Sequence, residues 1–299
     1  MKPQVSVVIP AFNAEARLGA TLQALNAQSG AIDAEIIVVD NASSDATAQV
    51  AREHGATVYF EAERGPAAAR NRGLLFANAP IIAHLDADTV PSRRWLRAMV
   101  VPFEDESVHI VAGNTVCYPP QTAAERYVHE SGLYDTERAI GRSVFPFAPS
   151  LNMAVRRSSA VAVCGWATDM PTGEDVDFSH RILERFGGTI VYACDAVLYH
   201  RVRATDEALS RQAFTYGEGA GDLYLRYAPE LPWTFMRTLT LAGTLVSRKT
   251  LALISPIAQC TGILPAHRAE YHRYNDLWTQ AFWRGFFQMY LHKERRRWT

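Results

Sequence analysis

Two acidic residues, Asp86 and Asp88, end the stretch 81–88, which begins as a short apolar run. A run of this kind is typical of a buried parallel strand, and open α/β sheets bind ligands at the carboxyl ends of such strands. If the strand continues to residue 88, the two carboxylates point to the same side of the sheet. Because adjacent negative charges repel each other, the pair indicates a divalent metal ion that links it to a diphosphate. The alternative is a strand that ends in a solvated acidic turn, closed by Pro91.

A second acidic cluster consists of Glu174, Asp175 and Asp177. Thr172 could cap a helix that starts here and runs through Leu183, and negative charges in the first turn of a helix are favourable without any function. A carboxylate that the helix dipole keeps ionised could also take the proton of a hydroxyl group as a general base. The residue pattern leaves both interpretations open.

Two further polar residues follow or flank the predicted strands. Asp40 closes the apolar run 34–39, and Arg70 stands in the first turns of a predicted helix over 67–77. Asp40 could accept a hydrogen bond from a nucleobase N–H or a ribose hydroxyl, and Arg70 could meet a base carbonyl or a phosphate. A turn-forming aspartate at the end of a strand is the alternative for Asp40.

The elements that must position these side chains alternate between strands and helices. Apolar runs predict strands over 5–10, 34–39, 58–60 and 81–88, and helical spacing predicts helices over 13–28, 45–54 and 67–77. This alternation is typical of βαβ units and predicts an α/β fold with a mostly parallel central sheet flanked by helices. The sequence has neither a G-x-G-x-x-G after its first strand nor a P-loop, which disfavours dinucleotide and P-loop sites. We therefore expect the ends of the strands to meet in one crevice that is neither a dinucleotide site nor a P-loop.

Composition limits the class of protein. The chain has 299 residues, 48% of them hydrophobic, and a net charge of −1, so no overall positive charge favours nucleic acid as a partner. Its four cysteines are widely spaced and form no Cys-x-x-Cys pair, which fits the reducing cytoplasm. No run of 18 apolar residues occurs, and the first predicted strand starts at Val5, which leaves no room for a signal peptide. We expect a cytoplasmic globular protein.

Four motifs in the first ninety residues resemble those of family 2 glycosyltransferases. They are Val-Ser-Val-Val-Ile-Pro-Ala-Phe-Asn-Ala from residue 5, Glu-Ile-Ile-Val-Val-Asp-Asn-Ala-Ser-Ser-Asp from residue 35, Gly-Pro-Ala-Ala-Ala-Arg-Asn-Arg-Gly from residue 65 and Leu-Asp-Ala-Asp from residue 85. Members of this family are inverting enzymes with a Rossmann-like nucleotide-diphospho-sugar transferase (GT-A) fold and a metal-binding Asp-x-Asp. The resemblance implies the same fold and Mn²⁺ or Mg²⁺ as cofactor.

The resemblance also implies roles for the residues of these motifs. Asp40 and Arg70 would hold the base, while Asp86 and Asp88 would serve the ribose, the diphosphate and the metal. The backbone of Pro10 and Ala11 would line the nucleotide crevice.

The match is looser in the second half of the catalytic region. An Asn before paired basic residues (Asn152), a Gly-aromatic turn (Gly165-Trp166) and a Glu-Asp pair recur in the family's order, with Trp in place of the common Phe. By resemblance Asp175 is the catalytic base, and Glu174 orients it or the acceptor. His200, at the end of the last predicted strand, is either a further metal or phosphate ligand or a structural residue.

The resulting hypothesis is an inverting glycosyltransferase that moves one sugar from a nucleotide-diphosphate sugar to a hydroxyl acceptor. UDP is the expected carrier, with GDP and dTDP open, and the acceptor is a glycan, a lipid-linked molecule or a small molecule. The spanning helices and the Gln-x-x-Arg-Trp run of processive synthases are absent, which favours transfer of a single sugar. Two alternatives are a sugar-1-phosphate nucleotidyltransferase of the same fold, whose Gly-rich loop is missing here, and a non-catalytic nucleotide- or glycan-binding partner subunit.

We divide the chain into a donor-binding half (1–107), an acceptor-binding half of the same domain (108–204) and a helical C-terminal extension (205–299). In the extension, the glycines of 217–221 mimic a phosphate loop, but no strand precedes them, so close helix packing or a hinge is the better interpretation. Over 281–299, an aromatic stripe precedes Lys293 and three arginines. This pattern fits a helix on an anionic membrane surface, one packed on the core, or one that joins two subunits of a homodimer. We favour peripheral contact with the inner face of the membrane, because lipid-linked acceptors are frequent in the family.

Overall fold

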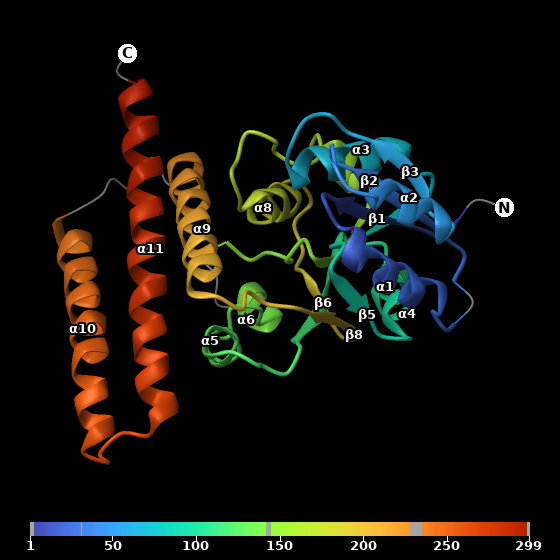
Figure 1. Cartoon of the computed structure of the whole chain (residues 1–299). Helices are drawn as coiled ribbons and strands as arrows, with labels where there is room; N and C mark the ends of the chain where they lie inside the picture. The colour runs from blue at the N-terminus through green and yellow to red at the C-terminus, as the bar shows by residue number, and fades with distance from the viewer. Residues whose placement is uncertain (1–2, 31, 142–144, 228–234, 298–299) are drawn as a thin grey trace. The chain divides into compact units, whose positions relative to one another are not determined.

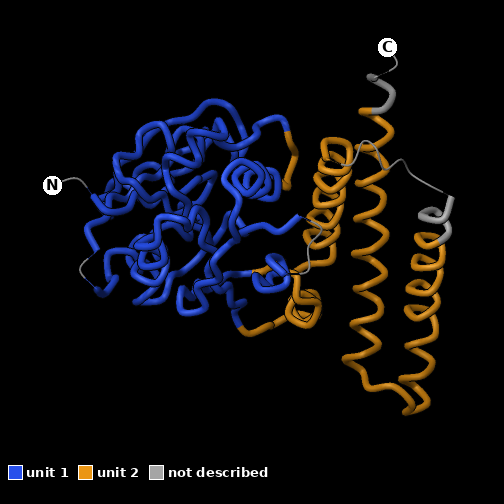
Figure 2. The backbone as a smooth tube through the Cα atoms, turned by 180° about the vertical axis from the view of Figure 1, so that it is seen from behind, with its two compact units in different colours: residues 1–118, 134–169, 174–201 blue, residues 119–133, 170–173, 202–299 orange. Residues whose placement is uncertain are grey.

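The chain forms two compact units, which the computed structural model describes over residues 3–30, 32–141, 145–227 and 235–297 (Figure 1). One unit comprises residues 1–118, 134–169 and 174–201, and the other comprises residues 119–133, 170–173 and 202–299 (Figure 2). The first contains the sheet and all the predicted site residues, whereas the second is helical. The proposed division of the first unit into donor and acceptor halves stays a prediction.

An eight-stranded sheet in the order β3-β2-β1-β4-β7-β6-β8-β5 is the centre of the first unit. The strands are β1 (Val5–Ala11), β2 (Ala34–Asp40), β3 (Thr57–Phe60), β4 (Ile81–Leu85), β5 (Thr89–Pro91), β6 (Ile110–Cys117), β7 (Asn152–Arg156) and β8 (Val191–His200). Strands β3, β2, β1 and β4 are parallel, which matches the alternation seen in the sequence. The later strands are mixed, because β7 runs antiparallel to both β4 and β6, and β5 runs antiparallel to β8. The expected α/β fold is confirmed, with a mixed sheet.

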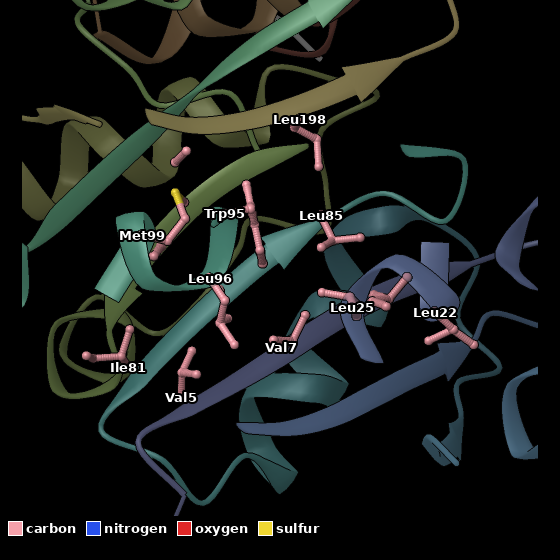
Figure 3. Packing of buried hydrophobic residues seen from close by; sticks show 14 of the residues in the cluster. Val5, Val7, Leu22, Leu25, Ile81, Leu85, Trp95, Leu96, Met99 and Leu198 are labelled. Carbon is pink, nitrogen blue, oxygen red and sulfur yellow. The ribbon is translucent and has the colours of Figure 1, made fainter. Parts of the chain in front are cut away.

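Helices cover both faces of this sheet. They are α1 (Glu15–Asn26), α2 (Thr47–Glu53), α3 (Pro66–Phe76), α4 (Trp95–Val100), α6 (Thr136–Gly141), α7 (Arg157–Ala162) and α8 (Glu174–Phe186), with a 3₁₀ turn at Val101–Glu104. Since successive strand residues point to opposite faces, Val7 packs with α1 and α4 while Val8 packs with α3 and α8. Figure 3 shows the first of these two cores, in which Leu22, Trp95 and Met99 meet the strands. The two cores together fix the positions at which the strands end.

Strand β4 ends at Leu85, before the two acids that were expected to continue it. The backbone N–H of Thr89 donates to the carbonyl oxygen of Asp86 at 3.2 Å, and the Thr89 hydroxyl donates to the same oxygen at 2.7 Å. A tight turn therefore replaces the strand between residues 86 and 88. The expectation that alternation along a strand aligns Asp86 with Asp88 was wrong.

The second unit consists of α5 (Ala123–Ser131), α9 (Asp206–Tyr227), α10 (Phe235–Cys260) and α11 (Ala266–Arg297). Helices α9 and α11 approach so closely that a Cβ at Gly217 would overlap the backbone carbonyl of Phe282, and one at Gly285 would overlap that of Phe214. The interpretation of the glycine-rich run as a close-packing surface is thus confirmed. None of the described helices combines the length and the apolarity that crossing a membrane requires.

The aromatic stripe of 281–299 packs inside this helical unit. Phe286 is 6% exposed, and its ring lies 6.0 Å from that of Tyr224 on α9, centroid to centroid. Lys293 also turns inward, since its Nζ donates to the carboxylate of Asp222 at 2.6 Å. The side chains of residues 294–297 lie outside the described part of the structure. For Phe286 the structure shows helix packing, which was one of the interpretations of this stripe. Membrane contact through 281–299 stays a prediction.

We expect Gly217→Ala to destabilise the helical unit, because α9 and α11 must separate to admit the added methyl group. Overpacking of this kind costs about 1–3 kcal/mol. Gly243→Ala is the matched control, since Gly243 lies in α10 with open space around its Cα, and alanine favours the helix by about 1 kcal/mol. Thermal unfolding followed by circular dichroism at 222 nm should therefore shift in opposite directions for the two variants. A rise for both would contradict the close contact.

Candidate active site

Arg70 lies at the centre of the candidate site and binds two carboxylates that are far apart in the sequence. Its side chain is 3% exposed, with Nη1 2.9 Å from Oε1 of Glu174 and Nη2 3.1 Å from Oδ1 of Asp86. Glu174 is the first residue of α8, and Asp86 directly follows β4. Breaking such a buried pair leaves an uncompensated charge, so the arginine fixes both carboxylates in place.

The packing of α3 explains how Arg70 reaches this position. Proline at the first helical position starts α3, as is common, and Gly73 lets the helix approach β1, because a Cβ there would overlap the side chain of Val8. The neighbouring Asn71 accepts from the backbone N–H of Trp166 and donates to its carbonyl oxygen, both at 2.8 Å. Asn71 thereby holds the segment that carries Trp166 against α3.

An aromatic wall of Trp166 and His84 lies next to Arg70. The guanidinium carbon is 5.0 Å from the centre of the Trp166 ring, and the ring of His84 meets the same indole edge-on at 5.2 Å. Trp166 is 3% exposed and stacks on Phe178 at 4.2 Å. Burial, together with the nearby Arg70 charge, holds the pKa of His84 well below its usual value, so this imidazole is neutral at physiological pH. The wall keeps water from one side of the arginine and strengthens its bonds to the carboxylates.

Asp86 keeps part of its carboxylate exposed while it pairs with Arg70. Loss of solvent raises its pKa, Arg70 opposes this rise, and the negative charge of Asp88 adds to it. The two acids therefore interact electrostatically, although they do not share one strand. Their other contacts differ, because Asp88 bonds to a different arginine.

Asp88 lies between Arg17 and His200. Nη1 of Arg17 is 3.2 Å from Oδ2 of Asp88, and Nδ1 of His200 is 4.0 Å from Oδ1. The antiparallel pairing of β5 with β8 sets Thr89 opposite His200 and so brings the histidine beside the acid. The structure thus places together two of the three residues that the sequence proposed as metal ligands.

The donor atoms at this point fit a metal that the bound substrate helps to hold. Carboxylate oxygens suit Mg²⁺ and Mn²⁺, whereas imidazole suits transition metals, so Asp88 with His200 fits Mn²⁺ better than Mg²⁺. Among the residues that the structure describes, no group of three or more His, Cys, Asp or Glu side chains is arranged to hold a metal on its own. A cation here would need the oxygens of a diphosphate to complete its shell.

Asp175 has a different environment from the other acids of α8. Its Oδ2 accepts from the backbone N–H of Ser150 at 3.2 Å, and its Oδ1 accepts from that of Val176 at 2.9 Å. Desolvation and the charge of Glu174 raise the pKa of Asp175 to about 7, against the opposing effects of Ser150 and Arg70. A carboxylate that titrates near neutral pH is suited to general-base catalysis.

The rest of the acidic cluster makes structural contacts. Asp177 is buried and accepts from Nη2 of Arg181, one turn along α8, at 2.6 Å. Glu174 is committed to Arg70. The first turn of α8 therefore carries the helix-stabilising charges that were one interpretation of the sequence, and the general-base role of Asp175 stays a prediction.

Asp40 lies apart from this cluster, at the end of β2. It is 9% exposed, and its Oδ1 accepts from the backbone N–H of Ser43 at 3.0 Å, the turn contact weighed for it. Ala11 is its partner residue on β1, and Pro10 precedes Ala11 on the same strand. A base contact by Asp40 and a crevice lined by Pro10 and Ala11 stay predictions.

Arg70 was expected to contact the base. Its terminal nitrogens instead bind carboxylates, and they do not line an exposed crevice in which a base could lie. Sequence reasoning also missed Asn41, which is 4% exposed and joins the end of β2 to the segment 61–65. It donates to the carbonyl oxygens of Glu61 at 3.2 Å and Glu63 at 2.6 Å, and accepts from the N–H of Gly65 at 2.8 Å. Its only signal in the sequence was its place next to Asp40. Sequence reasoning assigned no role to Asn71 or Arg17 either.

Comparisons with known proteins identify relatives of this chain. The family model described as "Glycosyl transferase family 2" matches residues 6–163. The chain is 32% identical to the glycosyltransferase AglE of Haloferax volcanii over 227 residues, which is 73% of each protein. It is also 33% identical to the pre-mycofactocin glycosyltransferase of Mycobacterium tuberculosis over 170 residues, which is 55% of this chain and 36% of that protein.

Two solved structures resemble the fold. A mannosyltransferase from Pyrobaculum calidifontis, in complex with GDP-Man and Mn²⁺, has a TM-score of 0.65 at 19% identity, over 94% of this chain and 87% of that one. The glucosyl-3-phosphoglycerate synthase of Mycobacterium tuberculosis, in complex with Mn²⁺, UDP and glucosyl-3-phosphoglycerate, has a TM-score of 0.56 at 20% identity, over 78% and 82% of the two chains. At these identities the likeness concerns the fold.

We expect the pKa of Asp175, measured by ¹³C NMR of its carboxyl carbon, to lie near 7 in the wild-type protein. Arg70→Gln should raise it further, because the arginine charge favours the ionised carboxylate. Asp175→Asn identifies the resonance by its disappearance. Arg185→Gln, an exposed arginine in the last turn of α8, is the matched control and should leave the pKa unchanged. A wild-type pKa near the ordinary value of about 4 would refute the account of the site.

Proposed function

The chain belongs to glycosyltransferase family 2, and from this we propose that it is an inverting enzyme that moves one sugar from a UDP-sugar to a hydroxyl acceptor. The observation that carries the proposal is the Arg70 cluster. By binding Glu174 and Asp86 at once, Arg70 fixes the start of α8, and with it Asp175, relative to the acids that follow β4. An acceptor-activating base and a diphosphate-binding edge are the two parts that transfer with inversion requires.

Asp175 is the general base of the proposed reaction. Its carboxylate takes the proton of the acceptor hydroxyl while the acceptor oxygen forms a bond to the anomeric carbon, and the bond from that carbon to the diphosphate oxygen breaks. The proton ends on Asp175, and the nucleoside diphosphate leaves from the opposite side of the sugar, which inverts the configuration. The pKa of about 7 supports this role, because a base is most effective when its pKa lies near the working pH.

Glu174 acts as a positioning residue in this scheme. Its bond to Arg70 holds the first turn of α8, and its charge helps to raise the pKa of Asp175. Arg70 takes the role of organising these carboxylates in place of the expected base contact. The side chain of Asp40 and the backbone of Pro10 and Ala11, which belong to two adjacent strand ends, bind the nucleoside.

Asp88 and His200, with Asp86 nearby, would hold a divalent cation together with the donor diphosphate. When bound, the cation supplies positive charge that stabilises the leaving diphosphate. Arg17, already paired with Asp88, is placed to contact the same phosphates when the cation engages that carboxylate. Mn²⁺ in the two solved structures supports Mn²⁺ as the ion.

The nucleotide and the acceptor are the finer parts of the proposal. One structural relative holds GDP-Man and the other holds UDP, so the fold accommodates both. We favour UDP because the carboxylate of Asp40 can accept a hydrogen bond from the N–H of uracil. The acceptor is a glycan, a lipid-linked molecule or a small molecule, since the relatives' names indicate chemically different acceptors. A non-catalytic binding subunit is disfavoured by the neutral-range pKa of Asp175.

The donor site is tested by calorimetric titration of UDP, GDP and dTDP in the presence of Mn²⁺ or EDTA. We expect Mn²⁺-dependent binding of UDP, weakened at least about tenfold in Asp88→Asn because a charge is lost from the cation's shell. Asp33→Asn is the matched control, because it removes an exposed carboxylate that precedes β2, at the end of the strand opposite to Asp40. If Asp88 has no part in holding the cation, the two variants will bind UDP alike. Failure of every nucleotide to bind would favour the non-catalytic alternative.

The base assignment predicts that Asp175→Asn binds the donor nucleotide like the wild type but transfers sugar about 10²- to 10⁴-fold more slowly. In the wild type, kcat/KM should fall about tenfold per pH unit below about 7, because only the ionised carboxylate accepts a proton. Both are measured with a panel of UDP-sugars and hydroxyl acceptors, and release of UDP reports the transfer. Loss of donor binding in Asp175→Asn would contradict the assignment.

A further inference from the structure

Helix α10 carries an apolar stripe that points away from the rest of the helical unit. Val246, Leu253 and Ile257 are 65%, 66% and 67% exposed. Spacings of seven and four residues place these three side chains on one side of a helix. Large apolar side chains on the surface are normal when they are scattered, but a continuous row marks an interaction site.

The opposite side of α10 faces α11 and includes polar side chains beside the buried Leu241. Nη1 of Arg248 donates to Oδ1 of Asn275 at 2.9 Å and also bonds to the hydroxyl of Thr279. Ser255, on the same side, is 2% exposed. Helix α10 therefore differs from an ordinary surface helix, whose apolar side faces the core, because polar side chains face α11 while large aliphatic ones are exposed.

The row continues into the turn between α10 and α11. Ile254 is 50% exposed, and Ile263 in that turn is 79% exposed. Six of the fourteen exposed large hydrophobic side chains that the structure describes lie between residues 246 and 263. Exposed apolar side chains are thus concentrated on this helical hairpin.

The charge of the same segment has one sign. Residues 240–268 contain Arg248, Lys249 and Arg268 but no aspartate or glutamate. Lys249 and Arg268 are exposed, while Arg248 faces α11. A surface that combines exposed aliphatic side chains with positive charge complements an anionic lipid headgroup layer above an apolar interior.

We propose that the outward face of α10 and the turn at residues 261–265 dock on an anionic lipid bilayer, with α10 parallel to the membrane plane. The aliphatic row enters the headgroup region, and Lys249 and Arg268 contact the anionic headgroups. Only one side of α10 is available for this contact, because α11 covers the other through Arg248. This docking surface on α10 is distinct from the aromatic stripe of 281–299.

A second copy of the chain fits this surface less well than a bilayer does. If two such faces met, Lys249 and Arg268 of one copy would approach those of the other, with no acidic side chain in residues 240–268 to offset the repulsion. An anionic bilayer supplies the negative charge that a second copy lacks.

The test is co-sedimentation of the full chain with vesicles of phosphatidylcholine and phosphatidylglycerol in a 3:1 ratio, and with vesicles of phosphatidylcholine alone. The variant is Leu253→Glu combined with Ile257→Glu. The matched control is Leu75→Glu combined with Val161→Glu, which places the same charges on helices α3 and α7 at side chains 65% and 52% exposed. Size-exclusion chromatography with light scattering measures the mass of each protein.

We expect the wild type and the control to bind the anionic vesicles. Both should bind at least tenfold more weakly to neutral vesicles, or to anionic vesicles in 0.5 M salt. The α10 variant should bind the anionic vesicles at least tenfold more weakly than the wild type. No binding to anionic vesicles, or equal binding by the α10 variant and the control, would overturn the proposal. A dimer that the α10 variant disrupts, without vesicle binding, would show that a second copy covers the face. Calorimetry with UDP and Mn²⁺ on the same variants keeps this result separate from the proposed transfer activity, which the α10 changes should not affect.

Discussion

The buried charge of Arg70 is the constraint on which the candidate site depends. A guanidinium that is 3% exposed must be compensated, and Glu174 and Asp86 provide the compensation from two different elements. A third carboxylate, that of Asp175, lies within the electrostatic influence of the same guanidinium. One arginine charge is therefore surrounded by three acids. Loss of solvent raises the pKa values of Asp86 and Asp175, and a neighbouring charge adds to each rise, that of Asp88 for Asp86 and that of Glu174 for Asp175. Arg70 opposes both rises, so the contact that orders the site also limits how far these pKa values rise.

The position of Arg70 in turn depends on contacts between uncharged groups. Gly73 allows α3 to lie against Val8, and the two bonds of Asn71 to the backbone of Trp166 hold the adjoining segment. That segment turns at Gly165, whose φ of +71° is a left-handed conformation and whose missing Cβ leaves room for the side chain of Asn71. The aromatic wall then limits water around the guanidinium. The position of the charged groups of the site thus depends on three uncharged residues below them, Gly73, Asn71 and Trp166.

The sequence predicted the fold well where its signals are local. Strands β1 to β4 and helices α1 to α3 follow from apolar runs and periodicity, since β1 and β4 are buried on both faces and each connection is short. The mixed order of the later strands could not be predicted, because antiparallel insertion of β7 depends on pairing between distant segments. The same limit applies to the site. Its acids were identified by type and spacing, but the Arg70–Glu174 pair spans 104 positions, and His200 reaches Asp88 only through pairing of β5 with β8.

The balance of charge around Asp88 accounts for a requirement of the proposed reaction. Asp86, Asp88, Glu174 and Asp175 carry up to four negative charges in this region, and Arg70 and Arg17 offset two of them. A donor diphosphate adds further negative charge, so the side chains alone would repel it. In the proposed function, a divalent cation held by Asp88 and His200 would supply positive charge that offsets this repulsion. Arg17, which pairs with Asp88, would add a second positive charge nearby. Metal and donor should therefore bind cooperatively, each more tightly in the presence of the other.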